Sequence, residues 1–188
     1  MPACPLATVL YRFDDAARFP IFESHTTAKG PVTVQADRDD AGDFIRIVYQ
    51  RYEADPNEVT IVLALPLVGV DGQPHQLLLD VFGDAVRRAD RGSDEPTEEG
   101  GSGRVRGCHL YLEGMDASGS LLALSFGLVD FAGWRTLRAD ASQLVPPVQF
   151  HRLRADIAAA PTASAPFRLG VRSLSLTGEV RVAAAGIA

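Results

Sequence analysis

The sequence predicts an all-β fold, and three observations carry that prediction. Short segments of alternating apolar and polar residues follow one another through most of the 188 residues. Gly, Pro, Asp and Asn separate these segments at short intervals, and beyond the short turn at Asp14–Arg18 no segment has the pattern of a helix. Alternation at period two with frequent turns is typical of a β-sandwich or a β-barrel.

The expected strands can be placed one after another along the chain. Residues 59–65 form a nearly continuous apolar, β-branched run, which indicates a strand in the centre of a sheet. From Leu110 the alternation is regular, a turn cluster follows at Asp116–Gly119, and a second turn at Asp130–Gly133 leads to the single tryptophan, Trp134. In order, the expected strands are 7–13, 32–36, 44–50, 59–65, 76–82, 104–113, 121–127, 134–139, 148–157 and 167–177.

The chain length favours a single β-sandwich domain over residues 1–188, with its core in residues 7–178. Residues 84–103 contain almost no apolar side chains and end in a Gly-Ser run, so this segment is predicted to be a mobile loop. The alanine-rich end, residues 179–188, is predicted to be a linker.

The charge is distributed unevenly between residues 1–133 and residues 134–188. The net charge of −6 and the pI near 5.2 argue against a nucleic-acid binder, which needs a basic surface. Residues 134–188, however, hold seven arginines and three acidic residues. Either the charges of the two parts neutralise each other within one sandwich, or the arginines form a surface that binds an anion. The arginines proposed for that surface are Arg135, Arg138, Arg152, Arg154 and Arg172.

Trp134 has two alternative roles. In a sugar-binding protein an exposed aromatic ring provides a platform for the apolar face of a sugar, whereas after a tight turn a tryptophan commonly packs into the core. The sequence favours a structural Trp134 buried in the sandwich, with Asp130 in a structural turn before it. Tyr49, Tyr52 and Tyr111 are the other candidates for an aromatic platform.

Nothing in the sequence indicates a catalytic, metal or cofactor site. Cys4 and Cys108 lack the spacing of a zinc site, which leaves two small buried apolar residues or one disulfide. No phosphate-binding loop and no nucleophile motif is present. The four histidines are scattered along the chain at His25, His75, His109 and His151. We therefore expect a protein that is not an enzyme and needs no cofactor.

The order of these segments resembles a known family. An apolar strand, a Gly-Asp step, two further strands around an Asp-x-x-Gly turn, and the sequence Asp130-Phe-Ala-Gly-Trp-Arg135 are similar to bacterial jelly-roll modules of the galactose-binding-like and carbohydrate-binding type. The resemblance covers residues 7–178 and extends to the extracytoplasmic domains of FtsX-type ABC permeases. It implies a two-sheet antiparallel jelly-roll sandwich.

The family also suggests a calcium site, from which this sequence departs. Many such modules hold calcium between acidic residues near the first strand and an aspartate in the last strand. Asp14 and Asp15 match the first half, but Val171–Leu176 contains no acidic residue. Calcium takes six to eight oxygen ligands, so no metal is expected.

The resemblance implies a non-catalytic, extracytoplasmic binding module of a larger bacterial membrane-associated protein, such as an ABC transporter permease ectodomain. Its expected partner is another protein or an anionic glycan. One alternative is a carbohydrate-binding module of a secreted carbohydrate-active enzyme, and a second is an enzyme with an unrecognised site. No signal peptide is expected, and the longest apolar stretch, Val59–Val70, is too short to span a membrane and contains Pro66.

Overall fold

The computed structural model describes residues 7–21, 30–49, 59–84, 107–157 and 166–184. Within these ranges the chain forms nine strands and one short 3-10 helix. The elements are β1 Thr8–Arg12, η1 Ala16–Arg18, β2 Val32–Asp39, β3 Gly42–Tyr49, β4 Val59–Asp84, β5 Cys108–Met115, β6 Leu121–Val129, β7 Ala132–Asp140, β8 Val148–Ile157 and β9 Phe167–Ala184.

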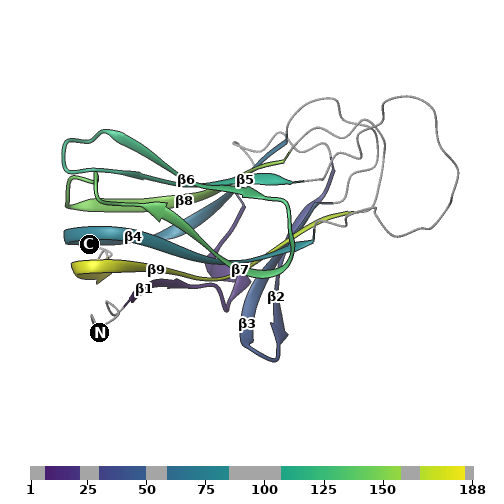
Figure 1. Cartoon of the computed structure of the whole chain (residues 1–188). Helices are drawn as coiled ribbons and strands as arrows, with labels where there is room; N and C mark the ends of the chain where they lie inside the picture. Colours follow the sequence, from purple (N-terminus) through teal and green to yellow (C-terminus); the bar gives the residue numbers. More distant parts are fainter. Residues whose placement is uncertain (1–6, 22–29, 50–58, 85–106, 158–165, 185–188) are drawn as a thin grey trace, which may run out of the picture.

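Two antiparallel layers share one strand. The first layer consists of β6, β5, β8 and the first half of β4. The second consists of β7, the second half of β4, β9, β3 and β2, with β1 beside β3 on the same edge of β9. Figure 1 shows β6, β5 and β8 above β4, β9 and β1. The predicted fold class, an all-β two-sheet antiparallel jelly-roll sandwich, is confirmed.

Strand β4 is 26 residues long and joins the two layers. Its first half pairs with β8, its second half with β7, and its opposite edge with β9. Pro66 lies where the pairing with β8 is interrupted, and Pro74 lies beside a register shift with β9. Proline has no N–H to donate, so a strand tolerates it at such interruptions. The expected strands 59–65 and 76–82 are therefore parts of one continuous strand.

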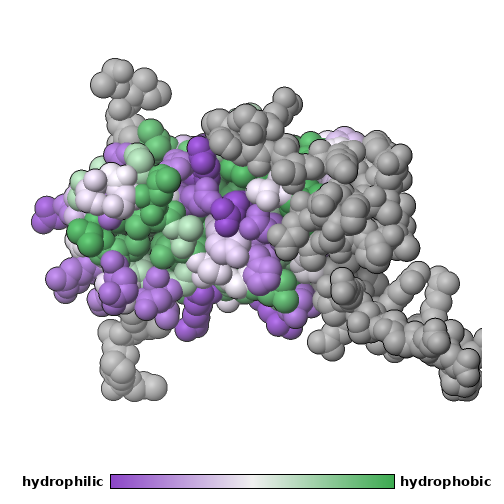
Figure 2. Space-filling view, turned by 90° about the horizontal axis from the view of Figure 1, so that it is seen from above, coloured by the Kyte–Doolittle hydropathy of each residue, from purple (hydrophilic) through white to green (hydrophobic). Residues whose placement is uncertain are grey.

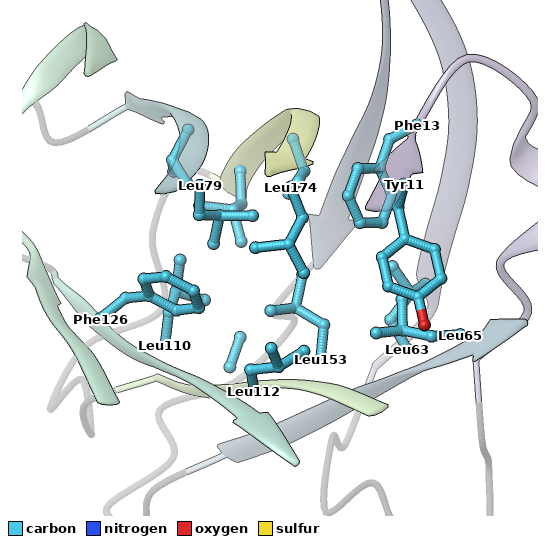
Figure 3. Close-up of a cluster of buried hydrophobic side chains, with 14 of the residues drawn as sticks. Tyr11, Phe13, Leu63, Leu65, Leu79, Leu110, Leu112, Phe126, Leu153 and Leu174 are labelled. Atoms are coloured by element: carbon cyan, nitrogen blue, oxygen red, sulfur yellow. The ribbon is translucent and has the colours of Figure 1, made fainter. Parts of the chain in front are cut away.

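Inward side chains of both layers meet in one core (Figure 3). Leu110 and Leu112 of β5 face it from the first layer, and Leu79 and Leu174 face it from the second. Burying one such side chain stabilises the fold by about 1.5–3 kcal/mol relative to leaving it exposed. The alternation read from Leu110 onward therefore reflects this shared core.

Cys108 is fully buried at the start of β5. Burial, assisted by the nearby charge of Asp156, raises the pKa of its thiol to about 12. The interpretation of Cys108 as a small buried apolar residue is confirmed, while Cys4 lies outside the described residues.

The end of the chain differs from the expected linker. Strand β9 continues to Ala184, and residues 179–184 pair with residues 68–73 of β4. The prediction of a linker is therefore wrong for these six positions, because the long edge of β4 offers them a partner. Of the predicted mobile loop, Asp84 is the last residue of β4, and residues 85–103 lie outside the described residues.

Candidate functional site

The five predicted arginines do not share one surface. Arg152 and Arg154 project from β8 on the outer face of the first layer. Arg138 and Arg172 project from β7 and β9 on the outer face of the second layer, whereas the Arg135 guanidinium lies over the Phe131 ring, 4.5 Å from its centroid. The expectation of a single arginine surface is wrong because β8 belongs to a different layer from β7 and β9.

The outer face of β5 and β8 carries an aromatic and polar surface. Strand alternation that turns Leu110 and Leu112 inward turns His109, Tyr111 and Glu113 outward. The Tyr111 ring is half-buried and lies directly across from Arg154, whose guanidinium carbon is 4.4 Å from the ring centroid. The exposed His109 ring stacks beside Tyr111, with centroids 6.4 Å apart and planes 27° apart.

Two carboxylates hold the arginines of this surface in place. Arg154 Nη1 donates to Glu113 Oε1 at 2.6 Å, and Arg154 Nε lies 3.3 Å from Asp156 Oδ2. Arg152 Nη1 lies 3.9 Å from the other Glu113 oxygen, and the Thr60 hydroxyl donates to Asp156 at 2.9 Å. Because two guanidinium groups face two carboxylates, the surface offers both donors and acceptors at no net charge. We call Thr60, His109, Tyr111, Glu113, Arg152, Arg154 and Asp156 the Tyr111 surface.

His151 adds an imidazole beside this surface. It occupies an irregularity in the pairing of β8, next to Arg152. Partial burial lowers the pKa of His151, and the positive charge of Arg152 lowers it further. The imidazole is therefore mainly neutral at pH 7, and its protonation does not add to the charge of the surface.

Trp134 lies on the outer face of the second layer, so the prediction that it packs into the core is wrong. Its ring is half-buried and meets the rings of Phe44 and Phe82 edge-on, at centroid distances of 5.1 and 5.6 Å. The Arg172 guanidinium covers the Trp134 ring at 3.8 Å, and Arg172 Nη2 donates to both carboxylate oxygens of Asp39 at 2.6 Å. The Trp134 ring is thus packed in an outer cluster and covered by Arg172 instead of forming an open platform.

Gly170 of β9 makes room for this outer cluster. A Cβ at Gly170 would come within 2.8 Å of Phe82 Cβ and 3.4 Å of the Phe44 ring. Because Gly170 has no side chain, the aromatic rings of three different strands can meet above it. Phe44, Phe82, Trp134, Asp39 and Arg172 are called the Trp134 cluster below.

The acidic residues considered for calcium have other contacts. The Asp15 carboxylate accepts the Ala17 N–H at 3.0 Å and caps η1, and Asp14 lies 3.7 Å from Arg18. Among the described residues, no three His, Cys, Asp or Glu side chains are arranged to hold a metal ion. Asp130 is exposed in the short link between β6 and β7.

Sequence reasoning named part of the Tyr111 surface. It named Tyr111 as a possible platform and named Arg152 and Arg154, but it did not place them side by side. Of the other tyrosines considered, Tyr49 is buried and Tyr52 lies outside the described residues. Glu113 was not predicted, although it lies two residues after Tyr111 on the same strand. Alternation places two such residues on the same face of the sheet.

The fold is similar to that of solved carbohydrate-binding modules. CtCBM11, known from a solution structure, gives a TM-score of 0.54 at 10% sequence identity and covers 95% of this chain and 98% of its own. TmCBM61, solved with beta-1,4-galactotriose, gives 0.48 at 8% identity over 88% of this chain and 92% of its own. The C-terminal family 22 module of Clostridium thermocellum Xyn10B gives 0.41 at 11% identity over 90% and 93%.

At these identities the likeness to CtCBM11 concerns the fold alone. No protein-family model and no curated protein matches the chain. The likeness agrees with the resemblance to jelly-roll modules of the carbohydrate-binding type, and these three structures lend no support to the resemblance to FtsX-type permeases. In the part of the chain that the structure describes, no helix is long and apolar enough to cross a membrane.

Proposed function

We propose that this chain is a non-catalytic carbohydrate-binding module that binds a glycan on the Tyr111 surface. The observation that carries the proposal is the group of Tyr111, Arg154 and His109 on the outside of the sheet: the Arg154 guanidinium lies over the half-buried Tyr111 ring, and the exposed His109 ring stacks beside it. Pyranose rings present apolar C–H faces, which pack against aromatic rings, and hydroxyl groups, which need donors and acceptors at their rim.

The polar residues around Tyr111 suit such hydroxyl groups. Arg152 and Arg154 present planar guanidinium donors, and Glu113 and Asp156 present acceptors. The ion pairs hold these side chains in fixed positions, so little conformational entropy is lost when a ligand binds. The likeness of the fold to CtCBM11 supports the same class of function, and a glycan ligand favours an extracytoplasmic location.

Paired arginines favour a neutral glycan over the anionic one expected from the sequence. Arg152 and Arg154 already face carboxylates on the Tyr111 surface. For an anionic ligand the better candidate site is Arg138, which is exposed on β7 and forms no ion pair with a described residue. The two surfaces are on different layers, so one experiment can separate them.

The test measures binding of the purified chain to a panel of neutral and acidic polysaccharides by affinity electrophoresis and calorimetry. We expect Tyr111→Ala to weaken binding to a neutral glycan at least about tenfold, or ~1.4 kcal/mol. Tyr111→Phe should retain most of the affinity because it keeps the ring. Arg138→Ala is the matched control on the other layer and should bind like the wild type.

Other results would contradict the proposal. Salt-sensitive binding to acidic polysaccharides, lost in Arg138→Ala and kept in Tyr111→Ala, would assign the function to the second layer. Failure of the wild type to bind any polysaccharide of the panel would remove the carbohydrate-binding function itself. Thermal unfolding of each variant shows whether the fold is intact.

A further inference from the structure

We propose that β6 is a dimerisation edge, on which a second copy of this chain pairs its own β6 in antiparallel orientation. Among the described strands, β6 pairs with β5 alone. Its outer edge therefore carries backbone N–H and C=O groups that no described strand uses. Such an edge is a template for pairing with another strand.

The composition of β6 sets it apart from the edge strands β1, β2 and β7. Leu121–Val129 contains nine residues, none of them charged and none of them proline. In contrast, β2 ends in Asp37, Arg38 and Asp39, and β7 and β1 carry arginines. Charged residues on an edge strand discourage strand pairing, and β6 lacks the charges that β1, β2 and β7 carry.

Apolar side chains are exposed along this edge. Leu121 is 79% exposed, Leu128 is 44% exposed, and Met115 of the neighbouring β5 is 40% exposed. Leu122 and Leu124 point toward the core but remain half-buried at its rim. Figure 2, which looks down on the top of Figure 1 where β6 and β5 lie, shows hydrophobic surface gathered toward one end of the molecule. Apolar surface at an unpaired edge indicates an interaction site.

The geometry of β6 fixes the register of the proposed pair. Phe126 is an extra residue in the pairing with β5, so the longest regular run of the strand is residues 121–125. The centre of that segment is Ala123. A two-fold axis at Ala123 places Leu122 opposite Leu124 of the second copy and leaves each Ala123 opposite its counterpart. Leu122 of each copy is then covered by Leu124 of the other.

A second copy is the partner that this edge fits. Each copy carries a net charge of −6, which opposes association, so a contact between copies should add no further charged groups. Residues 121–125 satisfy this condition and are self-complementary in size, with two leucines facing two leucines. An isologous contact of this kind closes after two subunits and does not lead to filaments.

The dimer has a consequence that rests on the proposed function. The two-fold axis of an antiparallel strand pair is perpendicular to the sheet, so the outer faces of both first layers lie on the same side. The two Tyr111 surfaces then belong to one continuous sheet and can engage one polysaccharide chain together. Linked sites can raise the affinity for a polymer by ~10²-fold or more over one site.

The first experiment measures the molecular mass by sedimentation equilibrium from micromolar to submillimolar concentration. We expect the wild type to shift from monomer to dimer and Ala123→Lys to stay monomeric, because two lysines would face each other across the axis. Ala36→Lys is the matched control, an exposed alanine on the edge strand β2, and should dimerise normally. A monomeric wild type, or an Ala123→Lys variant with unchanged dimerisation, would overturn the proposal.

The second experiment tests the register in a Cys4→Ser background. Ala123→Cys should form a disulfide-linked dimer under mild oxidation, whereas Ala36→Cys should not, since facing residues of an antiparallel pair come close enough for a disulfide. Cys108 is fully buried and should not contribute. Cross-linking through Ala36→Cys and not through Ala123→Cys would place the contact on β2 and refute the assignment to β6.

Bivalent binding is tested separately from dimerisation. The readout is the ratio of the affinity for a long polysaccharide to the affinity for a short oligosaccharide, which should be ~10²-fold lower in Ala123→Lys than in the wild type. The ratio is needed because residue 123 lies opposite Glu113 of the Tyr111 surface, so the lysine also alters each single site. An equal ratio in both proteins would exclude bivalency while the sedimentation result stands on its own. Loss of oligosaccharide binding in Tyr111→Ala alone tests the proposed function and leaves the dimer unaffected.

Discussion

Trp134 Nε1 donates a hydrogen bond to Asp39 Oδ2 at 2.6 Å, although 95 positions separate the two residues in the sequence. Trp134 belongs to β7 and Asp39 ends β2, which are opposite edges of the second layer. Neighbouring strands lie about 4.8 Å apart, so a flat layer would separate these two strands by roughly 19 Å. The layer therefore curves, and the tip of the β2–β3 hairpin reaches over its outer face.

The contacts of Asp39 predict a pH-dependent contribution to stability. Burial opposes ionisation of Asp39, but hydrogen bonds from the Ala41 N–H and from Trp134, together with the charge of Arg172, outweigh it and hold its pKa below the ordinary value. A carboxyl whose pKa is lower in the folded state stabilises the fold above its unfolded pKa. That contribution is lost as the pH falls through the folded pKa.

We expect Asp39→Asn to lower the melting temperature at pH 7 and to have a smaller effect near pH 3, where the wild type has lost part of the same contribution because the pH is below the unfolded pKa. Circular dichroism melts at both pH values provide the measurement. Asp71→Asn, at an exposed aspartate of β4, is the control. An equal decrease for Asp39→Asn at both pH values would show that its charge plays no part.

Gly170→Ala tests the packing of the Trp134 cluster. The new methyl group would lie 2.8 Å from Phe82 Cβ, so the aromatic rings must shift. Overpacking of this kind costs about 1–3 kcal/mol. Since Trp134 is the single tryptophan, its fluorescence in a urea titration reports both the loss of stability and the change around the ring. Gly69→Ala is the control, because a Cβ there meets one backbone oxygen at an ordinary 3.7 Å.

Tyr11→Phe tests a buried hydroxyl that joins β1 to two other strands. The Tyr11 hydroxyl donates to the Pro66 carbonyl at 2.9 Å and lies 3.3 Å from the Phe150 carbonyl, and burial raises its pKa. Its removal should destabilise the protein by about 0.5–1.5 kcal/mol in urea unfolding, with an unchanged slope. Tyr111→Phe, on the outer face, should change stability by less than about 0.5 kcal/mol. Equal effects of the two substitutions would contradict this assignment.

Alternation of apolar residues predicted most strands but was misapplied at Trp134. Leu137 points inward, and at period two a residue three positions earlier lies on the opposite face. The sequence therefore contained the signal that Trp134 faces outward. Its partner Asp39 could not be foreseen, because the curvature of a whole layer brings the two residues together.

The positions of the arginines relative to one another could not be predicted from the sequence, for a different reason. Sequence shows which residues alternate on one strand, but not which strand lies beside it. Arg154 meets Glu113, 41 positions away, through the pairing of β8 with β5, and Arg172 meets Asp39, 133 positions away, through the curvature of the second layer. Pairing also explains why β4 was expected as two separate strands. A proline ends a strand only where the pairing needs its N–H, and Pro66 lies where the pairing with β8 is interrupted.

The continuity of β4 bears on how the molecule loses its structure. A strand that is hydrogen-bonded into both layers transmits the opening of either one to the other. The layers are therefore not independent units of local opening, and the chain should melt as one cooperative body. Most of the pairings of β4 also join segments far apart in the sequence, so folding must close long loops before this strand is secured, which makes assembly slow.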